Sequence, residues 1–314
     1  MKILITGVHG FVGNNLVDYL SCDHIIYGLD IVAPEKSGVV RTYSWDDLDA
    51  GLVPDVDAIV HLAGKAHDTK NQAAADVYFK VNTGLTVKIF DYFCSHKIEK
   101  FVFFSTAKAA ADKVEGVLTE DVAPAPVGPY GESKIAAEKY ILDALSSDKF
   151  DFSGRGVYIF RPCMIHGPGN KGNLNLLYSV VSKGIPWPLG AFENRRTFTS
   201  IENMCFAVRG VLCGDVASGI YNMGDDEALS TNELIGLICE VLGRKARIWR
   251  LPKGLMKTVA VVGGWLHLPL NPERLRKLTE DYMSSNQKIK DALGITHMPV
   301  SARDGLKTTI ESFK

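Results

Sequence analysis

The stretch Thr6-Gly7-Val8-His9-Gly10-Phe11-Val12-Gly13 decides how this chain folds. It follows a short apolar strand, Ile3-Leu4-Ile5, and leads into an apolar helical pattern that continues through Leu20. Three glycines between a strand and a helix suit a tight turn, close approach of backbone to a pyrophosphate, and close packing of helix on sheet. We therefore predict a dinucleotide site here, with contacts from Gly7, Gly10, Phe11, Val12 and Gly13.

A carboxylate follows this turn at the sequence separation expected for a residue that contacts a ribose. A second apolar strand, from His24 to Leu29, ends in Asp30, seventeen residues after Gly13. An acid in that place accepts hydrogen bonds from the ribose hydroxyls, which favours NAD. The spacing is GxxGxxG rather than the usual GxGxxG, and Lys36 could offset part of the repulsion between Asp30 and a 2′-phosphate. NADP therefore stays open.

Apolar strands and amphipathic helices alternate through the first half of the chain. We expect strands at residues 2–6, 24–29, 39–43, 57–62, 100–105 and 157–161, and helices at about 11–21, 47–51, 72–95 and 130–146. This alternation predicts an α/β fold with a doubly wound parallel sheet of Rossmann type and the cofactor over its carboxyl edge.

After residue 165 the pattern loosens into mixed helices and short strands. We expect a dinucleotide-binding domain over residues 1–165 and a smaller α/β lobe over residues 166–314. Residues 219–223 read as a strand that returns to the main sheet, so the two lobes are expected to interleave.

Composition is that of an ordinary enzyme. The 314 residues are 46% hydrophobic with a net charge of −1, which argues against disorder and against a nucleic-acid partner. Six isolated cysteines without a CxxC pair favour a reducing compartment. Residues 256–270 are short for a bilayer span, and we interpret them as a buried helix broken at Gly263-Gly264. We expect a cytoplasmic protein with no membrane partner.

One tyrosine has a distinctive neighbour. Of eleven tyrosines, only Tyr130 has a lysine four residues later, Lys134. On a helix this spacing stacks the ammonium near the phenol and lowers the pKa of the phenol, so that Tyr130 can exchange protons near neutral pH. The pair taken alone also suits an ordinary surface helix.

The glycine turn together with YxxxK near residue 130 resembles the extended short-chain dehydrogenase/reductase family, of the NAD-dependent epimerase/dehydratase type. Further family-like segments follow in order: 60–64, 81–82, 103–106, 161–162, 166–169 and 196–198. The resemblance implies a nucleotide-sugar substrate in the second lobe. It also implies a homodimer formed through helices 72–95 and 130–146, although their apolar faces also suit a core.

The resemblance carries catalytic roles over to three side chains. Tyr130 would exchange the proton of a substrate hydroxyl. Lys134 would lower the pKa of Tyr130 and touch the nicotinamide ribose, and Thr106 would bind the same substrate oxygen. Ser105 is the less favoured donor. Further cofactor contacts are expected from Leu62, Ala63 and Gly64.

Two neighbouring residues restrict the reaction. Sugar-nucleotide 4,6-dehydratases of the family carry an Asp-Glu pair after the position of Thr106, whereas this chain has Ala107-Lys108. Dehydration by that route lacks its acid and base, while chemistry at carbon 4 remains open.

Residues later in the chain are candidates for binding the substrate, and the histidines do not form a metal-binding pattern. By resemblance, Arg196 would bind a nucleotide diphosphate with help from Arg195, and Asn173 and Lys277 are weaker candidates for uridine and phosphate. His61, His67 and His166 lack a set of carboxylates, so no metal site is expected.

More narrowly, segments 105–109, 161–169 and 186–196 resemble bacterial reductases of UDP-4-keto-6-deoxy-N-acetylhexosamines, which make precursors of surface polysaccharide. Ala110 and His166 depart from the residues common in epimerase relatives. The first alternative is a UDP-hexose or UDP-N-acetylhexosamine 4-epimerase, which uses the same residues with retained NAD. The second is a dinucleotide-binding sensor without catalysis.

Overall fold

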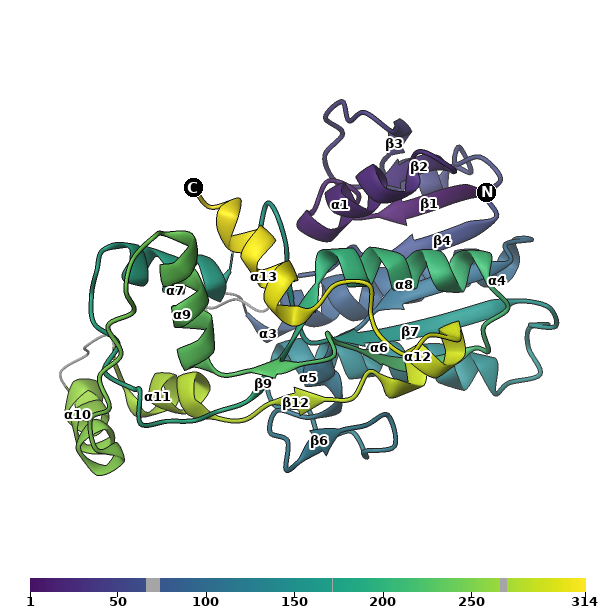
Figure 1. Ribbon diagram of the computed structural model, residues 1–314. Helices are drawn as coiled ribbons and strands as arrows, with labels where there is room; N and C mark the ends of the chain where they lie inside the picture. Colours follow the sequence, from purple (N-terminus) through teal and green to yellow (C-terminus); the bar gives the residue numbers. More distant parts are fainter. Residues whose placement is uncertain (66–73, 171, 266–269) are drawn as a thin grey trace.

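A parallel sheet forms the centre of the molecule (Figure 1). The computed structural model describes residues 1–65, 74–170, 172–265 and 270–314. Within these ranges the sheet has seven strands in the order β10-β7-β5-β4-β1-β2-β3. They are β1 (Lys2–Thr6), β2 (Ile25–Leu29), β3 (Val39–Tyr43), β4 (Ala58–His61), β5 (Lys100–Phe104), β7 (Gly156–Pro162) and β10 (Gly219–Met223).

The strand order reverses between β1 and β4. From β1 the chain moves outward to β2 and β3, then crosses back to place β4 on the other side of β1. In parallel sheets such a reversal leaves a crevice at the carboxyl ends of the two strands, where ligands bind. The predicted doubly wound α/β sheet is therefore confirmed, and each of its six predicted strands lies within about two residues of the observed one.

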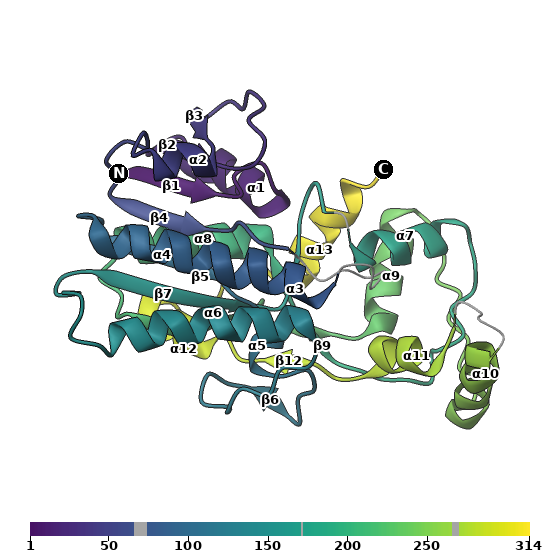
Figure 2. The same ribbon diagram turned by 180° about the vertical axis from the view of Figure 1, so that it is seen from behind.

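Helices cover both faces of the sheet (Figures 1 and 2). One face carries α1 (Phe11–Leu20), α8 (Ile201–Cys213) and α12 (Gln287–Leu293), packed on alternate strand residues such as Ile3, Ile5 and Val60. The other carries α2 (Trp45–Asp49), α4 (Leu85–Ser95) and α6 (Pro129–Leu145), packed on Leu4, Ile59 and others. Alternation of side chains along each strand thus builds two cores.

The helix predicted over residues 72–95 is not one regular helix. It consists of α3 (Ala75–Tyr78), the π-helical segment η1 (Phe79–Gly84) and α4, while residues 72–73 lie outside the described ranges. A π segment adds backbone without adding a turn, so an apolar pattern of helical period does not reveal it. It shifts the side chains of residues 79–84 relative to the flanking helices.

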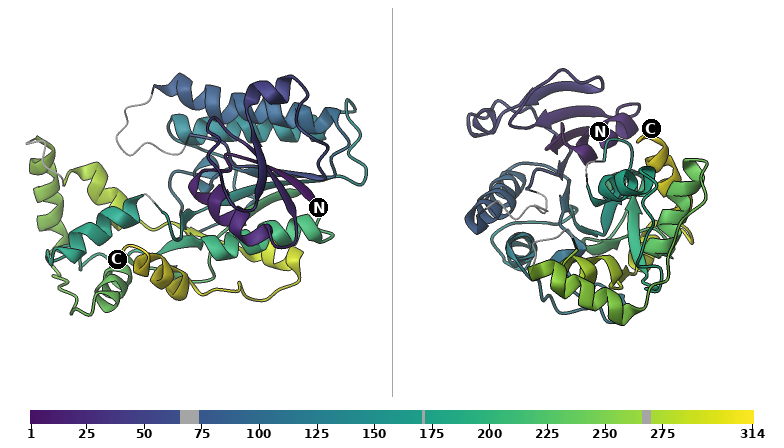
Figure 3. Two further views of the ribbon diagram at one scale, coloured as in Figure 1. Left: turned by 90° about the horizontal axis from the view of Figure 1, so that it is seen from above. Right: turned by 90° about the vertical axis from the view of Figure 1, so that its left-hand side faces the viewer.

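The second lobe is built from small sheets and helices (Figure 3). Strands β11 (Ala228–Leu229), β9 (Arg196–Ser200) and β8 (Met164–His166) form one sheet, and β12 (Met283–Ser284) pairs with β6 (Val117–Leu118). The helices are α7 (Asn173–Ser182), α9 (Thr231–Val241), α10 (Lys253–Trp265), α11 (Pro272–Thr279) and α13 (Ala302–Glu311), whereas the short α5 (Ala107–Ala110) packs on α6 and β7. Because β10, α8 and α12 lie on the main sheet, chain beyond residue 165 contributes to both lobes. The domain border at residue 165 stays a prediction.

Helix α10 differs from its prediction as a buried helix. Met256, Ala260 and Gly263 are buried, but the neighbouring Leu255 and Val259 are exposed. The helix also runs past the expected glycine break to Trp265. Apolar residues on more than one side of the helix gave no indication of which apolar side would face solvent. Over the described part of the chain, no helix is both long and apolar enough to cross a membrane.

A buried ion pair joins α6 to β7. Arg161 Nη2 and Nε donate to Glu138, with both Nε–Oε distances at 3.1 Å. Glu138 also accepts a hydrogen bond from Ser105, which follows β5. Both members of the pair are essentially inaccessible to water. The carboxylate therefore bonds the helix to the ends of two adjacent strands.

Removal of the Glu138 carboxylate should destabilise the fold strongly. Glu138→Ala leaves the Arg161 guanidinium buried without its counter-ion, so we expect the free energy of unfolding in urea to fall by about 3–5 kcal/mol. Asp143→Ala, at an exposed position of the same helix, should change it by less than about 0.5 kcal/mol. Equal losses in the two variants would contradict a structural role for the pair, and Glu138→Leu with Arg161→Met should cost less than Glu138→Ala alone.

Candidate active site

The glycine turn fits against the end of β4 so closely that side chains are excluded. Gly7 has a φ of +68°, and a Cβ there would lie 2.8 Å from the backbone nitrogen of Ala63. A Cβ on Gly13 would lie 2.5 Å from the carbonyl oxygens of Gly7 and Val8. The predicted reasons for glycine at positions 7 and 13 are thus visible as steric contacts.

The N-terminus of α1 is open to an anion. Its N-cap, Gly10, offers no side-chain hydrogen bond, and no acidic residue lies in the first turn. Backbone N–H groups at such a helix end, here those of Phe11 and Val12, together with the helix dipole attract a phosphate. The Phe11 ring lies beside Gly167, so the loop after β8 borders this helix end.

Asp30 lies directly beyond β2, next to the glycine turn. Its carboxylate accepts hydrogen bonds from the backbone N–H of His9 at 3.1 Å and of Ile31 at 2.7 Å. Lys36, which could have offset its charge, is instead paired with Asp18 at 2.6 Å. The residues that come after Asp30 in the chain, 33–37 and 39–42, line a hollow of about 690 Å³. This arrangement suits the adenosine ribose of NAD better than a 2′-phosphate.

A hydrogen-bonded chain ties β1, β4 and α4 together beneath the crevice. The Thr86 hydroxyl donates to the Asn82 carbonyl at 2.6 Å and lies 2.9 Å from His61 Nε2. His61 Nδ1 lies 2.6 Å from the Thr6 hydroxyl, which accepts from Ala63 N–H. These roles are mutually consistent when the proton of His61 is on Nε2. Burial, followed by the charge of Lys134, holds the pKa of His61 well below its usual value, so the ring is neutral.

Lys134 is buried at the same edge. Its Nζ donates to the Phe104 carbonyl at 2.7 Å and lies 4.8 Å from the centre of the Phe103 ring. Burial lowers its pKa to about 8, against the opposing effect of Glu138. A Cβ on Gly64 would lie 3.3 Å from this Nζ. The structure thus places Lys134 next to Gly64, one of the three predicted cofactor residues after β4.

Tyr130 lies in the first turn of α6, with its ring centre 6.3 Å from that of Tyr78. Burial raises the pKa of Tyr130, and a hydrogen bond with Thr106 acts in the lowering direction. The prediction that Lys134 lowers this pKa is therefore wrong for this structure. Sequence spacing indicated that the two residues are close, but it did not include the cost of removing water from a phenolate.

The two hydroxyl groups that follow β5 have different hydrogen-bond partners. Ser105 donates to the buried Glu138 carboxylate. Thr106 caps the short α5, accepting from Lys108 N–H at 3.3 Å, and bonds the Tyr130 phenol. Of these two hydroxyls, Thr106 is the one with a hydrogen-bond partner at the phenol, and its role toward a substrate stays a prediction.

Sequence reasoning missed the role of Asn82. From the π segment, its Oδ1 accepts from Lys65 N–H at 2.7 Å, and its Nδ2 donates to the Lys65 carbonyl and to Ser133 Oγ at 3.2 and 3.0 Å. Asn82 therefore joins the segment after β4 to α6. The occurrence of Asn82 in the family-like segment 81–82 was a signal for its role. Glu138 was also missed, and its spacing of eight residues from Tyr130 was the corresponding signal.

The positions of the dehydratase carboxylates hold other chemistry. Ala107 is buried. Lys108 Nζ donates to the Asp112 carbonyl at 2.7 Å and pairs with its carboxylate at 3.1 Å. No acid–base carboxylate pair therefore follows Thr106.

Of the predicted substrate residues, Arg196 and Lys277 lie in contact with each other, whereas Arg195 and Asn173 have other surroundings. Arg196, at the start of β9, donates to the Lys277 carbonyl at 2.8 Å, and burial lowers its pKa. Lys277 itself pairs with Glu273 at 2.8 Å. The Arg195 side chain turns instead to Glu233 at 3.3 Å, and Asn173 is exposed at the first residue of α7. Their roles toward a substrate stay predictions.

The histidines have structural partners. His61 belongs to the hydrogen-bonded chain above. His166 lies 2.9 Å from the Thr309 hydroxyl and 3.4 Å from Asp225. His67 lies outside the described residues. Among the residues that the structure places, no three His, Cys, Asp or Glu side chains are grouped in a way that could hold a metal ion.

Comparison with known proteins identifies the family of this chain. The family model described as "NAD dependent epimerase/dehydratase family" matches residues 3–224. A UDP-glucose 4-epimerase of Vibrio cholerae is 34% identical over 278 residues, covering 80% of this chain and 78% of that protein.

Solved structures share the fold. MoeE5 in complex with UDP-glucuronic acid and NAD superimposes with a TM-score of 0.77 at 21% identity, covering 99% of this chain and 98% of that one. A UDP-glucuronic acid 4-epimerase from Bacillus cereus in complex with NAD gives 0.75 at 21% identity, covering 100% and 98%. With a family match over more than half its length, this chain belongs to the NAD-dependent epimerase/dehydratase family of extended short-chain dehydrogenase-type enzymes.

Proposed function

We propose that this protein reduces the 4-keto group of a UDP-4-keto-6-deoxy-N-acetylhexosamine with reduced NAD, in the synthesis of a surface-polysaccharide precursor. The observation that carries the proposal is the Tyr130–Thr106 hydrogen bond at the sheet edge, next to an Ala107-Lys108 pair that has no carboxylate for dehydration. NAD-dependent chemistry on a UDP-sugar is the broader statement, and the choice of a keto-sugar reductase is the finer proposal.

The residues at the crevice fit the cofactor. The open N-terminus of α1 would hold the pyrophosphate and Asp30 the adenosine ribose, while Lys134 and Gly64 would lie beside the nicotinamide ribose. When bound, the reduced nicotinamide supplies the hydride for carbon 4. The protein's own task is to orient the sugar and to manage one proton.

The proton comes from Tyr130. As carbon 4 accepts hydride, its carbonyl oxygen becomes an alkoxide; the phenol donates its proton to this oxygen while the Thr106 hydroxyl donates a hydrogen bond to it. A raised pKa keeps Tyr130 protonated at neutral pH, which suits an acid in the direction of reduction.

The sugar nucleotide would lie over the second lobe. Arg196, in contact with α11, would bind the diphosphate with Lys277, and Arg195 and Asn173 would lie at the uridine side. We also propose a cytoplasmic homodimer. In this chain α6 packs on both η1 and α4, so the outer surfaces of these helices would form the dimer contact.

A UDP-hexose or UDP-N-acetylhexosamine 4-epimerase is the second candidate. It is favoured by the 34% identity to a protein named UDP-glucose 4-epimerase. The same tyrosine would first remove a proton from the 4-hydroxyl and later return it. A non-catalytic sensor is a weaker third candidate, because Tyr130, Lys134 and Thr106 are all present at the edge.

Replacement of the Tyr130 hydroxyl should abolish turnover. With freshly generated UDP-4-keto-6-deoxy-N-acetylglucosamine and added NADH or NADPH, we expect oxidation of the reduced cofactor by the native protein. In Tyr130→Phe we expect kcat about 10³-fold lower, because the proton donor is lost. Cofactor binding, measured by calorimetry, should persist in the variant.

The same assay separates the candidates. Conversion of UDP-glucose or UDP-N-acetylglucosamine to its 4-epimer without net cofactor oxidation would replace the reductase by the epimerase. Cofactor binding without turnover of any of these sugars would instead favour the sensor.

The two hydroxyls after β5 should respond differently. Thr106→Val removes the donor beside Tyr130 and is expected to lower kcat about 10²-fold. In the matched variant Ser105→Ala, the lost hydrogen bond is to Glu138, so we expect a lower melting temperature but a change in kcat of less than about tenfold. The reverse pattern would identify Ser105 as the substrate donor.

Asp30 should set the cofactor preference. Asp30→Asn removes a negative charge where a 2′-phosphate would lie, and we expect the ratio of kcat/KM for NADPH to that for NADH to rise at least about tenfold. Asp46→Asn, an exposed acid on α2, is the matched control and should leave the ratio unchanged. An unchanged ratio in Asp30→Asn would place the ribose elsewhere.

A further inference from the structure

Helix α10 buries only one side of its apolar surface. Met256, Ala260 and Gly263 are buried, in a cluster that includes Leu189 and Leu275. These positions follow the i, i+4, i+7 spacing of a helix that packs on a protein core. This side anchors α10 to the second lobe.

The neighbouring side has the same spacing but faces solvent. Leu255, Val259 and Val262, each one residue earlier in the sequence, are exposed by 51%, 43% and 46%. Val261 is exposed as well, and Trp265 at the helix end is exposed by 81%. Isolated apolar residues on a surface are normal, but five on one helix of 13 residues form a patch that indicates a binding surface.

The chain around this patch is strongly cationic. Between Glu240 and Glu273 there is no acidic residue, although the whole chain has a net charge of −1. The same interval holds six lysines and arginines, all exposed: Arg244, Lys245, Arg247, Arg250, Lys253 and Lys257. Trp249, among these cations, is also exposed.

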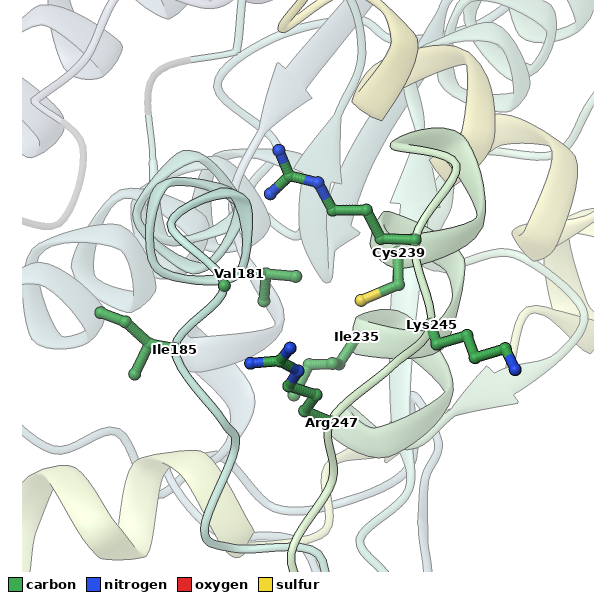
Figure 4. A pocket seen from close by; sticks show the side chains of 8 residues that line it. Val181, Ile185, Ile235, Cys239, Lys245 and Arg247 are labelled. Carbon is green, nitrogen blue, oxygen red and sulfur yellow. The ribbon is translucent and has the colours of Figure 1, made fainter.

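Three of these cations line a hollow earlier in the same interval (Figure 4). A pocket of about 410 Å³ is lined by Val181, Ile185, Ile235 and Cys239 together with Arg244, Lys245 and Arg247. The Arg247 guanidinium lies between Ile185 and Ile235, whereas Lys245 points away from them. On α10 itself, Lys253 and Lys257 are one turn apart. Apolar and cationic side chains thus occur together over residues 244–265.

We propose that the exposed side of α10, with the surrounding lysines and arginines, docks on the surface of an anionic phospholipid bilayer. Apolar side chains and tryptophan enter the boundary between headgroups and acyl chains, while the cations pair with lipid phosphates. A helix of 13 residues is about 20 Å long, too short to span the hydrocarbon, so it lies in the interface.

The position of α10 permits such a contact. Figures 1 and 2 show α10 at the end of the second lobe that is farthest from the central sheet. A flat surface can therefore meet it without covering the crevice at the ends of β1 and β4. The inference replaces the expectation of no membrane partner, and it does not depend on the proposed reaction.

Vesicle binding tests the proposal. The intact protein is sedimented with vesicles of phosphatidylcholine alone and of phosphatidylcholine mixed with phosphatidylglycerol. We expect binding to the anionic vesicles at least about tenfold tighter than to the neutral ones. Binding should weaken near 1 M salt, where the Debye length is about 3 Å.

Variants separate the apolar and charged contributions. Leu255→Gln/Val259→Gln/Val262→Gln should reduce binding to anionic vesicles at least about tenfold, and Lys253→Gln/Lys257→Gln should reduce the preference for them. The matched control Leu52→Gln/Val122→Gln/Val127→Gln, at exposed apolar positions elsewhere, should bind like the native protein. Unchanged melting temperatures and NAD affinities would show that the variants fold.

Three outcomes would overturn the inference. The native protein does not bind anionic vesicles, or the α10 variant binds as tightly as the control variant. Alternatively, light scattering shows an oligomer that the α10 variant disrupts while vesicle binding is absent, in which case the patch is covered by a second copy of this chain.

Discussion

The buried ion pair between Glu138 and Arg161 determines where α6 lies, and the rest of the candidate site depends on that position. Glu138 bonds to Arg161 on β7 and to Ser105 after β5, so the helix is held against two strands at once. A shift of α6 along its axis would separate two buried charges, which costs far more than a lost surface contact. Lys134 and Tyr130 lie one and two turns before Glu138, so the same bond sets their height above the sheet edge.

At the ends of β1 and β4, the side chains beneath the crevice are held by hydrogen bonds between neutral groups. Thr6, His61 and Thr86 form a continuous chain of hydrogen bonds, and the low pKa of His61 keeps the ring neutral. The π segment turns the Asn82 side chain toward the segment after β4 and toward α6, where each of its polar atoms has a partner. With neutral groups beneath the crevice, the electrostatic potential there is governed by Lys134 and the open end of α1.

Much of this arrangement could be predicted from the sequence, because short-range rules govern it. Glycine spacing gave the turn at Gly7 and Gly13, and strand alternation gave the parallel sheet. The π segment could not be predicted, because an extra backbone residue leaves an apolar helical pattern almost unchanged. Nor could the exposed side of α10 be predicted, because apolar residues lie on more than one side of this helix. The Tyr130 pKa was predicted in the wrong direction because spacing reports proximity and not desolvation.

The direction of that pKa bears on how one tyrosine can serve either reaction of the family. The site disfavours charge: burial raises the pKa of Tyr130 and lowers that of Lys134 to about 8. A reduced nicotinamide ring is neutral and would leave this balance unchanged, so in the proposed reductase the phenol would keep its proton and act as an acid. An oxidised ring is positively charged and would stabilise a phenolate, so in the alternative epimerase the same residue would first act as a base. Under the proposed roles, the redox state of the cofactor that enters would set the direction of proton transfer, so Tyr130, Lys134 and Thr106 alone do not distinguish a reductase from an epimerase.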